Sequence, residues 1–375
     1  MYLPVILVRE MGILGWVVFA VPNVIGAAAM GWVIGSPQAS AALVERHRPA
    51  CTLFSIVTVA FHAFFVIWLL PQVSALGNAP VILALVAAAV VYGPAQRLVR
   101  ASGQADTHPV DWSLAAAAVV YAISLAAAGV WLATVGIPAP PSAPSDRAAR
   151  AMALAPVCAF GFLLCPYLDL TFHRARMSCG RGGARWAFTL GFGGFFLAMI
   201  AFTLCYAPTL LDMPRAHGYG TPLHVALVAL SIHMAVQSGL TVAFHTRCMA
   251  PLRGQWRWLV WMAVAISVLA GMWSIASRHG LAAEGGEFVY RCFMGFYGLI
   301  FPAYVWLLMV PPVPRMRLGM GLWLAAVALA MPFFWMGFVE GRTIWLLPGL
   351  GAVLLCKLVA MWPSPLHRAQ PERGA

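Results

Sequence analysis

Charged residues are scarce in this chain. Only 9% of its 375 residues are Asp, Glu, Lys or Arg, 62% are hydrophobic, and the mean hydropathy is +0.85. A soluble domain needs far more polar surface to stay in solution, so the composition excludes a soluble globular protein. The solvent of this chain is a lipid bilayer.

Motifs for metal, cofactor or catalytic chemistry are also missing. The eight cysteines include no C-x-x-C pair and read as small core residues. No H-E-x-x-H, H-x-x-E or C-x-x-C-H pattern and no G-x-S-x-G elbow occurs. We therefore expect no metal, no cofactor and no enzymatic activity. A haem or metal bound by His62, His233 and His245 is the alternative from this class.

Long apolar runs are what the chain does contain. Each run is about 20 residues long, enough to cross roughly 30 Å of hydrocarbon, and none alternates like a barrel strand. We expect an all-α polytopic membrane protein with about eleven transmembrane helices and a partial N-terminal helix. The predicted spans are 13–34, 51–71, 79–96, 112–136, 151–172, 186–209, 222–245, 256–276, 288–311, 318–338 and 343–361.

Positive charge exceeds negative charge, with a formal net charge of +12. Basic residues of membrane proteins gather in cytoplasmic loops, so this excess indicates topology and not a nucleic-acid partner. Fifteen arginines fall in loops on the side of the C-terminus, and six fall on the other side. We expect a cytoplasmic C-terminus, a first span that starts outside, and location in a cell (cytoplasmic) membrane such as a bacterial inner membrane.

Two pairs of segments resemble one another at a fixed offset. Residues 15–33 resemble 185–203 (185 − 15 = 170), and residues 58–65 resemble 229–236 (229 − 58 = 171). The offset covers five spans, so the paired helices run in opposite directions, as in an inverted five-helix repeat. Chance similarity between apolar helices is the alternative.

The repeat divides one integral membrane domain, residues 1–362, into parts. We expect an incomplete first repeat over 1–136, an external Pro/Ser-rich linker over 137–150 and a second repeat over 151–311. Two extra helices over 318–361 and a disordered cytoplasmic tail over 363–375 follow.

Ionisable residues within spans are rare and therefore informative. The segment 161–176 contains Cys165, Pro166, Asp169 and His173, and Asp169 shares a helix face with both Cys165 and His173 at i,i+4 spacing. One interpretation is a helix broken at Pro166 whose freed carbonyls and side chains contact a solute or ion. The other is an interfacial helix end where Asp169 pairs with Arg176 or His173.

The span 222–245 has a polar stripe. Ser231, His233, Gln237 and Ser238 lie along it, and Thr241 and His245 continue it. Such a stripe must face protein or water, either as hydrogen-bonded helix packing or as a binding site, and a buried histidine could relay protons. The substrate- and ion-binding candidates of the chain are His62, Cys165, Asp169, His173, Ser231, His233, Gln237 and Ser238.

The first span has a helix breaker near its middle. Pro22 is expected to free the carbonyl of Val18 and kink the helix, and Asn23 to bond a freed group. Asn23, Ala27, Gly31 and Gly35 follow at i+4 steps and form a smooth stripe for close helix packing. We interpret this stretch as a packing joint next to the site.

Three segments resemble the sodium:solute symporter family. REMGILGWVVFAVPN (9–23) is similar to the turn into the family's core helix two. LLCPYLDLTFHRAR (163–176) is similar to the end of core helix six, and VALSIHMAVQSGL (228–240) resembles core helix eight. The resemblance covers residues 2–310. It implies the five-plus-five inverted-repeat fold of the leucine transporter and a solute site between core helices one, three, six and eight.

The chain departs from that family at two places. Residues 2–8 correspond to only the outer half of core helix one, which indicates a start called too late or an incomplete site. The family's sodium-coordinating serine pair falls on His233 and Met234, which are poor ligands for a hard cation. Sodium coupling is therefore in doubt, and proton coupling is open.

The sequence thus predicts a secondary transporter, a symporter-like permease, that moves a small polar solute across the membrane. The alternative is a membrane sensor or scaffold that kept the fold and lost transport. The partners expected are the lipid bilayer, a solute of unknown identity, and H+ or Na+.

Overall fold

The structure is a computed structural model that describes residues 2–73, 76–88, 112–137, 145–212, 220–249, 255–276, 282–312 and 316–361. Within these ranges every regular element is a helix, which confirms the all-α prediction. The expected tail, 363–375, lies outside the described residues, as do residues 138–144 of the expected linker.

The elements up to the middle of the chain are α1 (Leu3–Val33), α2 (Pro37–Arg46), α3 (Arg48–Trp68), α4 (Leu70–Val73), α6 (Trp112–Thr134), α7 (Arg147–Leu164), the 3-10 helix η1 (Cys165–Leu168), α8 (Leu170–Met177), α9 (Arg181–Leu190), the π-helix η2 (Gly191–Phe196) and α10 (Leu197–Asp212). Then follow α11 (Thr221–Met249), α12 (Gln255–Ala276), α13 (Ala282–Gly295), the π-helix η3 (Phe296–Ile300), α14 (Phe301–Leu308), α15 (Met316–Phe334), the π-helix η4 (Trp335–Val339), the 3-10 helix η5 (Thr343–Trp345) and α16 (Leu346–Met361).

Nine helical segments of the described residues are long and apolar enough to cross a membrane. They coincide with nine of the eleven predicted spans. The other two predicted spans, 79–96 and 343–361, contain the shorter apolar helical segments Ala79–Ala88 and Thr343–Val359, and residues 89–96 lie outside the described residues. The chain is therefore a multi-pass helical membrane protein.

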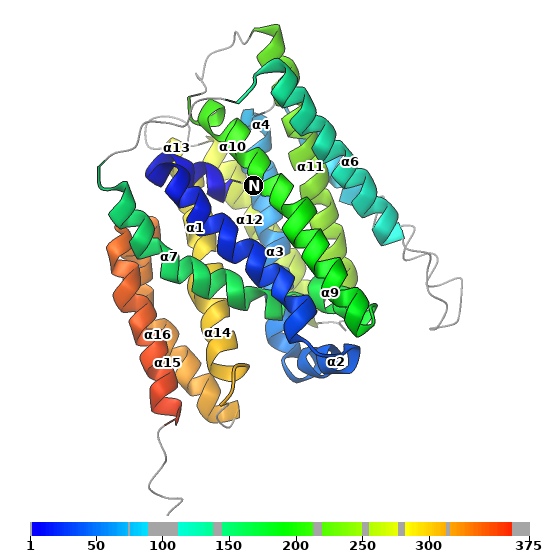
Figure 1. The fold of residues 1–375 in the computed structure, drawn as a ribbon. Coiled ribbons are helices and arrows are strands. Elements are labelled where there is room, and N and C mark those ends of the chain that lie inside the picture. The colour runs from blue at the N-terminus through cyan, green and yellow to red at the C-terminus, as the bar shows by residue number, and fades with distance from the viewer. Residues whose placement is uncertain are drawn as a thin grey trace, which may run out of the picture.

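The spans pack as one bundle, whose two ends we name the α13 end and the α2 end after the helices that lie there (Figure 1). α1 runs from the α13 end to the α2 end, and α3 returns. α9, η2 and α10 together run toward the α13 end, whereas α11 runs toward the α2 end. Within each of these two consecutive pairs, the spans therefore run in opposite directions.

The break in α1 lies at Gly12 and not at Pro22. Gly12 has φ 62° and ψ −149°, a conformation that residues with a Cβ rarely adopt, and it is the one non-helical residue within α1. Pro22 keeps helical dihedrals. The predicted kink at Pro22 stays a prediction, and α1 is a short helix before Gly12 joined at an angle to a full span after it.

The predicted packing stripe on α1 is partly right. Ala27 is buried, and a Cβ at Gly31 would lie 2.6 Å from the Ala184 carbonyl oxygen of α9. The closest approach comes from Gly26 instead, against the backbone of α7 at Phe162. Gly35 is exposed with nothing within 4 Å. The contact stripe therefore ends one turn earlier than the i+4 steps predict.

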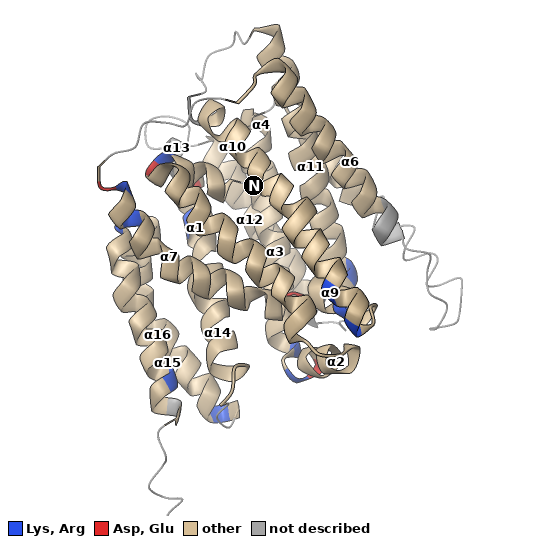
Figure 2. Ribbon diagram, in the orientation of Figure 1, with Lys and Arg blue, Asp and Glu red and all other residues tan. Residues whose placement is uncertain are grey.

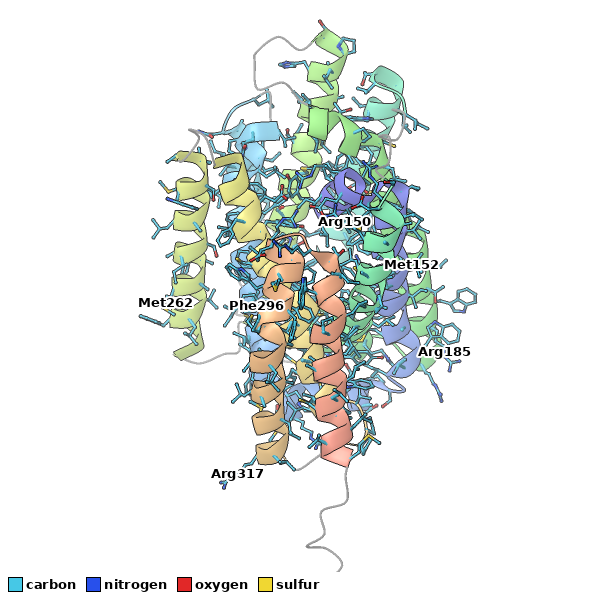
Figure 3. All side chains as sticks on the ribbon, turned by 90° about the vertical axis from the view of Figure 1, so that its left-hand side faces the viewer. Arg150, Met152, Arg185, Met262, Phe296 and Arg317 are labelled. Carbon is cyan, nitrogen blue, oxygen red and sulfur yellow. The ribbon has the colours of Figure 1, made fainter. Side chains whose placement is uncertain are left out.

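Large apolar side chains cover the outside of the bundle. Met152 and Met262 point away from it in Figure 3 and are 73% and 37% exposed. α12 exposes Trp258, Trp261 and Leu269 in the same way. Such a surface suits lipid and not water, in agreement with the apolar spans.

Charged side chains gather at the two ends of the bundle (Figure 2). At the α13 end, Arg9, Glu10, Arg150, Glu287 and Arg291 form an ion-paired group that we call the arginine network. It joins α1, α7 and α13, which lie far apart in the sequence.

Lys357 is a buried charge near the α2 end. Its Nζ donates hydrogen bonds to the carbonyl oxygens of Trp306, Val310 and Pro312, at 3.0, 2.6 and 2.8 Å. These carbonyls lie at or just beyond the C-terminus of α14, where helix carbonyls lack partners and a positive charge is stabilising. Lys357 of α16 therefore supplies hydrogen-bond donors to the carbonyl oxygens at the C-terminal end of α14.

Candidate functional site

The candidate site lies where α7 stops short of the α2 end. The 3-10 helix η1 follows directly, with Cys165 and Pro166 as its first two residues. Asp169 then adopts an extended conformation with φ −79° and ψ 109°. α8 starts at Leu170. The predicted broken helix is therefore present, and the chain leaves the helix at Asp169, three residues beyond Pro166.

Asp169 caps the N-terminus of α8. Its Oδ1 accepts hydrogen bonds from the backbone N–H groups of Thr171 and Phe172, at 2.8 and 3.4 Å, and from the Thr171 hydroxyl at 2.6 Å. Unpaired N–H groups and the helix dipole favour a negative charge at this position. This explains how a carboxylate that is only 9% exposed is accommodated.

The other carboxylate oxygen of Asp169 faces His245 of α11. Asp169 Oδ2 and His245 Nε2 lie 3.9 Å apart, too far for a hydrogen bond but close enough for an ion pair. The Nδ1 of His245 lies 3.1 Å from the hydroxyl of Ser55 on α3. His245 and Ser55 are almost completely buried.

This arrangement can hold His245 in either protonation state. In neutral His245 with its proton on Nε2, the Nε2–H faces Asp169 and Nδ1 accepts a hydrogen bond from the Ser55 hydroxyl. Protonated His245 would donate to Ser55 from Nδ1 and form a charged pair with Asp169. The hydroxyl of Ser55 serves both states because it can donate or accept.

One face of α3 continues the polar contacts toward the middle of the bundle. Cys51, Ser55, Thr58 and His62 follow at steps of three or four residues, so they lie on one face of the helix. Thr58 donates to the carbonyl oxygen of Phe54 and accepts the Tyr297 hydroxyl at 3.0 Å. The Nδ1 of His62 donates to the carbonyl oxygen of Thr58 at 2.8 Å.

The π-helix η3 meets the α7–η1 junction at this depth. The Cys165 thiol donates to the carbonyl oxygen of Tyr297 at 3.2 Å. One turn earlier, a Cβ added to Gly161 would lie 2.8 Å from the same oxygen. π-helical turns often mark functional positions, and irregular backbone at membrane depth is tolerated only where protein or a cavity surrounds it. Two irregular backbone segments thus pack against each other here.

We call this group the Asp169 cluster and define it as Ser55, Thr58, Asp169, Thr171, His245 and Tyr297. Asp169 is its one carboxylate, and its other members are neutral or, in the case of His245, titratable. Such a set can bind and release a proton or hold a small polar molecule by hydrogen bonds. Within the described part of the chain, no group of three or more His, Cys, Asp or Glu side chains is placed to hold a metal ion.

Three of the predicted site residues lie in or next to the cluster: Asp169, Cys165 and His62. His173 does not share a contact with the Asp169 carboxylate. Its Nε2 donates to the carbonyl oxygen of Tyr167 at 2.9 Å, and its Nδ1 lies 2.7 Å from the hydroxyl of Ser40 on α2. Burial lowers the pKa of His173, and the bond to Tyr167 and the charge of Asp169 oppose this shift.

Arg176, the other partner that the sequence offers for Asp169, bonds elsewhere. Its guanidinium donates to the carbonyl oxygens of Ile34 and Cys179 and closes the C-terminus of α1. The interfacial pairing of Asp169 with Arg176 or His173 is therefore not formed, and the carboxylate faces His245 instead.

The polar stripe of α11 divides between two neighbours. His233 and Gln237 both contact the hydroxyl of Ser124 on α6, at 2.9 and 3.1 Å, whereas His245 contacts α3. Steps of four residues advance by about 40° around a helix, so His245 lies about 120° from His233. Ser231 donates to the carbonyl oxygen of Leu227 in its own helix, and Ser238 is buried.

Sequence reasoning missed Ser55, Thr58 and Tyr297. The spacing of the polar residues on α3 was a usable signal for Ser55 and Thr58, because it places both on the face of His62. No local sequence pattern predicts the π-helix that positions Tyr297.

No family model matches the chain, and neither a curated protein nor a solved structure matches it.

Proposed function

We propose that the protein is a secondary transporter, a symporter-like permease, in which the Asp169 cluster couples solute movement to a proton. The observation that supports this most is the Asp169–His245 pair at a break between two helices. Charged groups at membrane depth are costly, and in polytopic proteins they commonly belong to ion or proton pathways.

The inverted five-helix repeat is part of this proposal. It draws support from the helix directions: α1 opposes the α9–α10 span, and α3 opposes α11 (Figure 1). These are the segments that resemble each other in sequence. The repeat and the resemblance to sodium:solute symporters both imply a solute site near helix breaks, which is where the Asp169 cluster lies.

A proton suits this cluster better than sodium. Sodium would need several oxygen ligands around one point, whereas the hydroxyl groups of the cluster already bond one another, His245, Asp169 or the backbone. The Asp169 carboxylate itself faces an imidazole, which can take up a proton. We propose that protonation of His245 draws its ring toward Asp169 and weakens the cap of α8, and that deprotonation reverses this. The α2 end, where the arginine-rich loops lie, would face the cytoplasm. No covalent chemistry is required of any residue.

Uptake by purified protein in proteoliposomes tests the proposal. The assay uses a panel of small polar solutes, imposed pH and sodium gradients, and a trapped pH dye. We expect saturable uptake that a pH gradient drives, abolished by Asp169→Asn and by His245→Gln. Ser231→Ala is the matched control, since its hydroxyl bonds its own helix backbone. Uptake that survives Asp169→Asn but not His233→Gln would move the coupling role to the α6–α11 contact.

A transport-inactive sensor or scaffold is the second candidate. It is favoured by the replacement of the family's sodium-binding serines with His233 and Met234. The polar groups of the Asp169 cluster also bond one another, as in a structural core. Folded protein that takes up no solute of the panel under either gradient would support this candidate over transport.

A further inference from the structure

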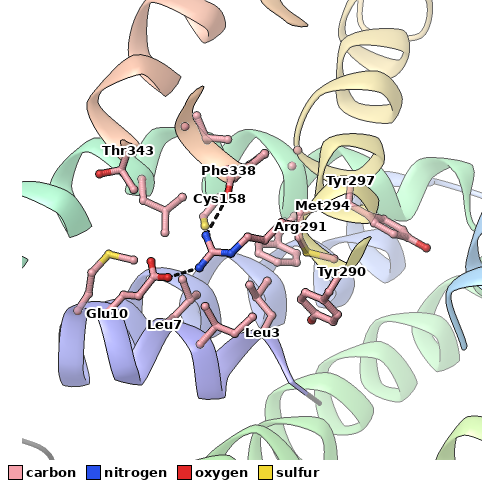
Figure 4. Close-up of a pocket in the computed structure, with 18 residues that line it drawn as sticks. Leu3, Leu7, Glu10, Cys158, Tyr290, Arg291, Met294, Tyr297, Phe338 and Thr343 are labelled. Atoms are coloured by element: carbon pink, nitrogen blue, oxygen red, sulfur yellow. Dashed lines mark hydrogen bonds and ion pairs between the residues drawn. The ribbon is translucent and has the colours of Figure 1, made fainter. Parts of the chain in front are cut away.

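A cavity of about 70 Å³ lies inside the α13 end, beside the arginine network (Figure 4). The first half of α1, together with α7, α13, η3, η4 and η5, surrounds it. Its wall is almost entirely apolar and includes Leu7, Leu154, Val157 and Phe338. The volume has room for several water-sized groups, yet an apolar cavity binds water poorly and apolar molecules well.

Charge is concentrated at one side of this cavity. Glu10 and Arg291 both contribute to its wall, and Figure 4 shows the Arg291 guanidinium between Glu10 and the backbone of Phe338. Arg291 donates to Glu10, to Glu287 at 2.7 Å and to the Phe338 carbonyl oxygen at 2.8 Å. The site therefore has an apolar interior and a charged mouth.

The charges at the mouth do not balance. The arginine network contains three guanidinium groups, Arg9, Arg150 and Arg291, but two carboxylates, Glu10 and Glu287. Arg150 accordingly donates one hydrogen bond to the carbonyl oxygen of Gly341, and Arg291 donates one to that of Phe338. A carboxylate accepts such hydrogen bonds about twice as strongly as a neutral carbonyl does.

We infer that this cavity binds an amphipathic monoanion, with an apolar chain in the cavity and a carboxylate or phosphate head at Arg291, which lines it, and at Arg150, which pairs with the same Glu10. A cationic head is disfavoured because the carboxylate of Glu10 already pairs with three arginines. The anion supplies the negative charge that the network lacks, and its chain fills space that water leaves empty.

This site is separate from the proposed transport pathway, and its test is a binding measurement that does not depend on uptake. The shared chemistry of an acyl chain and an anionic head has two sources, a free short-chain carboxylate and an anionic membrane lipid. The experiment distinguishes them by varying each alone.

The test uses the full chain in phosphatidylcholine nanodiscs and follows its thermal unfolding. Hexanoate, hexanol and hexylammonium are titrated separately, so that the chain is constant and the head changes. Phosphatidylglycerol is added to the nanodiscs in a separate series. A ligand that binds the folded state raises the unfolding temperature with concentration. We expect stabilisation by hexanoate or phosphatidylglycerol and not by hexylammonium.

Variants locate the effect. Cys158→Leu adds bulk inside the cavity and should abolish the shift, whereas Arg150→Gln should weaken binding roughly tenfold through loss of one charge-assisted hydrogen bond. Arg342→Gln is the matched control, because Arg342 is an exposed arginine at the same end. An effect of phosphatidylglycerol alone that depends on Arg150 identifies a lipid as the occupant. No shift with either anion, an equal shift with hexylammonium, or a shift that Arg150→Gln leaves unchanged would overturn the inference.

Discussion

The arginine network and the Asp169 cluster accommodate charge inside the bundle in different ways. In the arginine network, each carboxylate is paired with at least two guanidinium groups, and Arg291 joins Glu10 of α1 to Glu287 of α13. In the Asp169 cluster, one carboxylate is held by the N-terminus of α8 and by hydroxyl and imidazole groups. The carboxylates of the arginine network are therefore neutralised by positive charge, whereas the carboxylate of Asp169 is stabilised by hydrogen bonds and dipoles.

This difference bears on what each region can do. Guanidinium groups keep their proton at any physiological pH, so the arginine network holds its members together unless it opens as a whole. A histidine beside a carboxylate can change charge with small changes in its surroundings. The α13 end is therefore suited to hold α1, α7 and α13 in place, and the Asp169 cluster is suited to respond.

Removal of Arg291 should have the largest effect on stability. Arg291→Gln leaves Glu10 and Glu287 facing each other with less compensation, and loss of one partner from a buried ion pair costs roughly 3–5 kcal/mol. The unfolding free energy in mixed micelles measures this loss. Arg342→Gln removes an arginine from the exposed pair with Glu340 and should cost about 0–1 kcal/mol. Similar losses in the two variants would contradict the buried network.

Gly161→Ala should have the next largest effect, because it disturbs the contact between α7 and Tyr297, a member of the Asp169 cluster. Gly161 belongs to the wall of the cavity, and its added Cβ would lie 2.8 Å from the Tyr297 carbonyl oxygen. Overpacking of this kind costs about 1–3 kcal/mol. Gly129→Ala is the control: nothing lies within 4 Å of that Cβ, and alanine should stabilise the helix by roughly 0.5–1 kcal/mol. Opposite signs are therefore expected in one unfolding assay.

Asp169 variants separate the structural role of the carboxylate from its charge. Asp169→Ala removes the cap of α8 and should cost about 0.5–2 kcal/mol, whereas asparagine caps a helix about as well as aspartate. Asp169→Asn should therefore keep the wild-type stability while it loses proton-coupled uptake. If asparagine destabilises the protein as much as alanine does, the negative charge itself is needed for folding.

The smallest effect concerns pH and the α2 end, where His173 packs beside the Asp169 cluster. Burial lowers the pKa of folded His173 below its ordinary 6.5, against the opposing effects of Tyr167 and Asp169. The unfolded chain therefore takes up a proton here first, and the stability present above pH 6.5 is lost as the pH falls below it. His173→Gln should reduce this acid sensitivity in thermal unfolding between pH 7 and 5. His47, whose pKa burial and Arg46 also lower, contributes to the part that remains.

The spans and the broken helix could be predicted from the sequence because both follow from local composition. Apolar length alone marks the nine spans, and Pro166 followed by Asp169 marks the end of α7. The partner of Asp169 could not be predicted, since His245 lies 76 residues away (245 − 169 = 76) and is only one of several residues on a polar stripe. Three steps of four residues turn that stripe by about 120°, so its two ends meet different helices.

The arginine network could not be predicted from the sequence for a different reason. Arg9, Glu10 and Glu287 lie outside the predicted spans 13–34 and 288–311, and Arg150 lies in the predicted linker 137–150. Helix α1 begins at Leu3, and its break at Gly12 lets the short first half pack under α13. The positive φ of Gly12 therefore brings four charged residues from predicted loops together in an interior network. Hydropathy patterns carry no information on a backbone φ angle, so the sequence did not predict this.

Lys357 makes the C-terminal end of α14 depend on α16. The carbonyl oxygens of Trp306, Val310 and Pro312 have no amide partner further along α14, and the ammonium group that satisfies them belongs to the last helix. These oxygens gain the ammonium group as a partner only when α16 packs against α14. A chain cut just before residue 357 would leave the C-terminus of α14 without it.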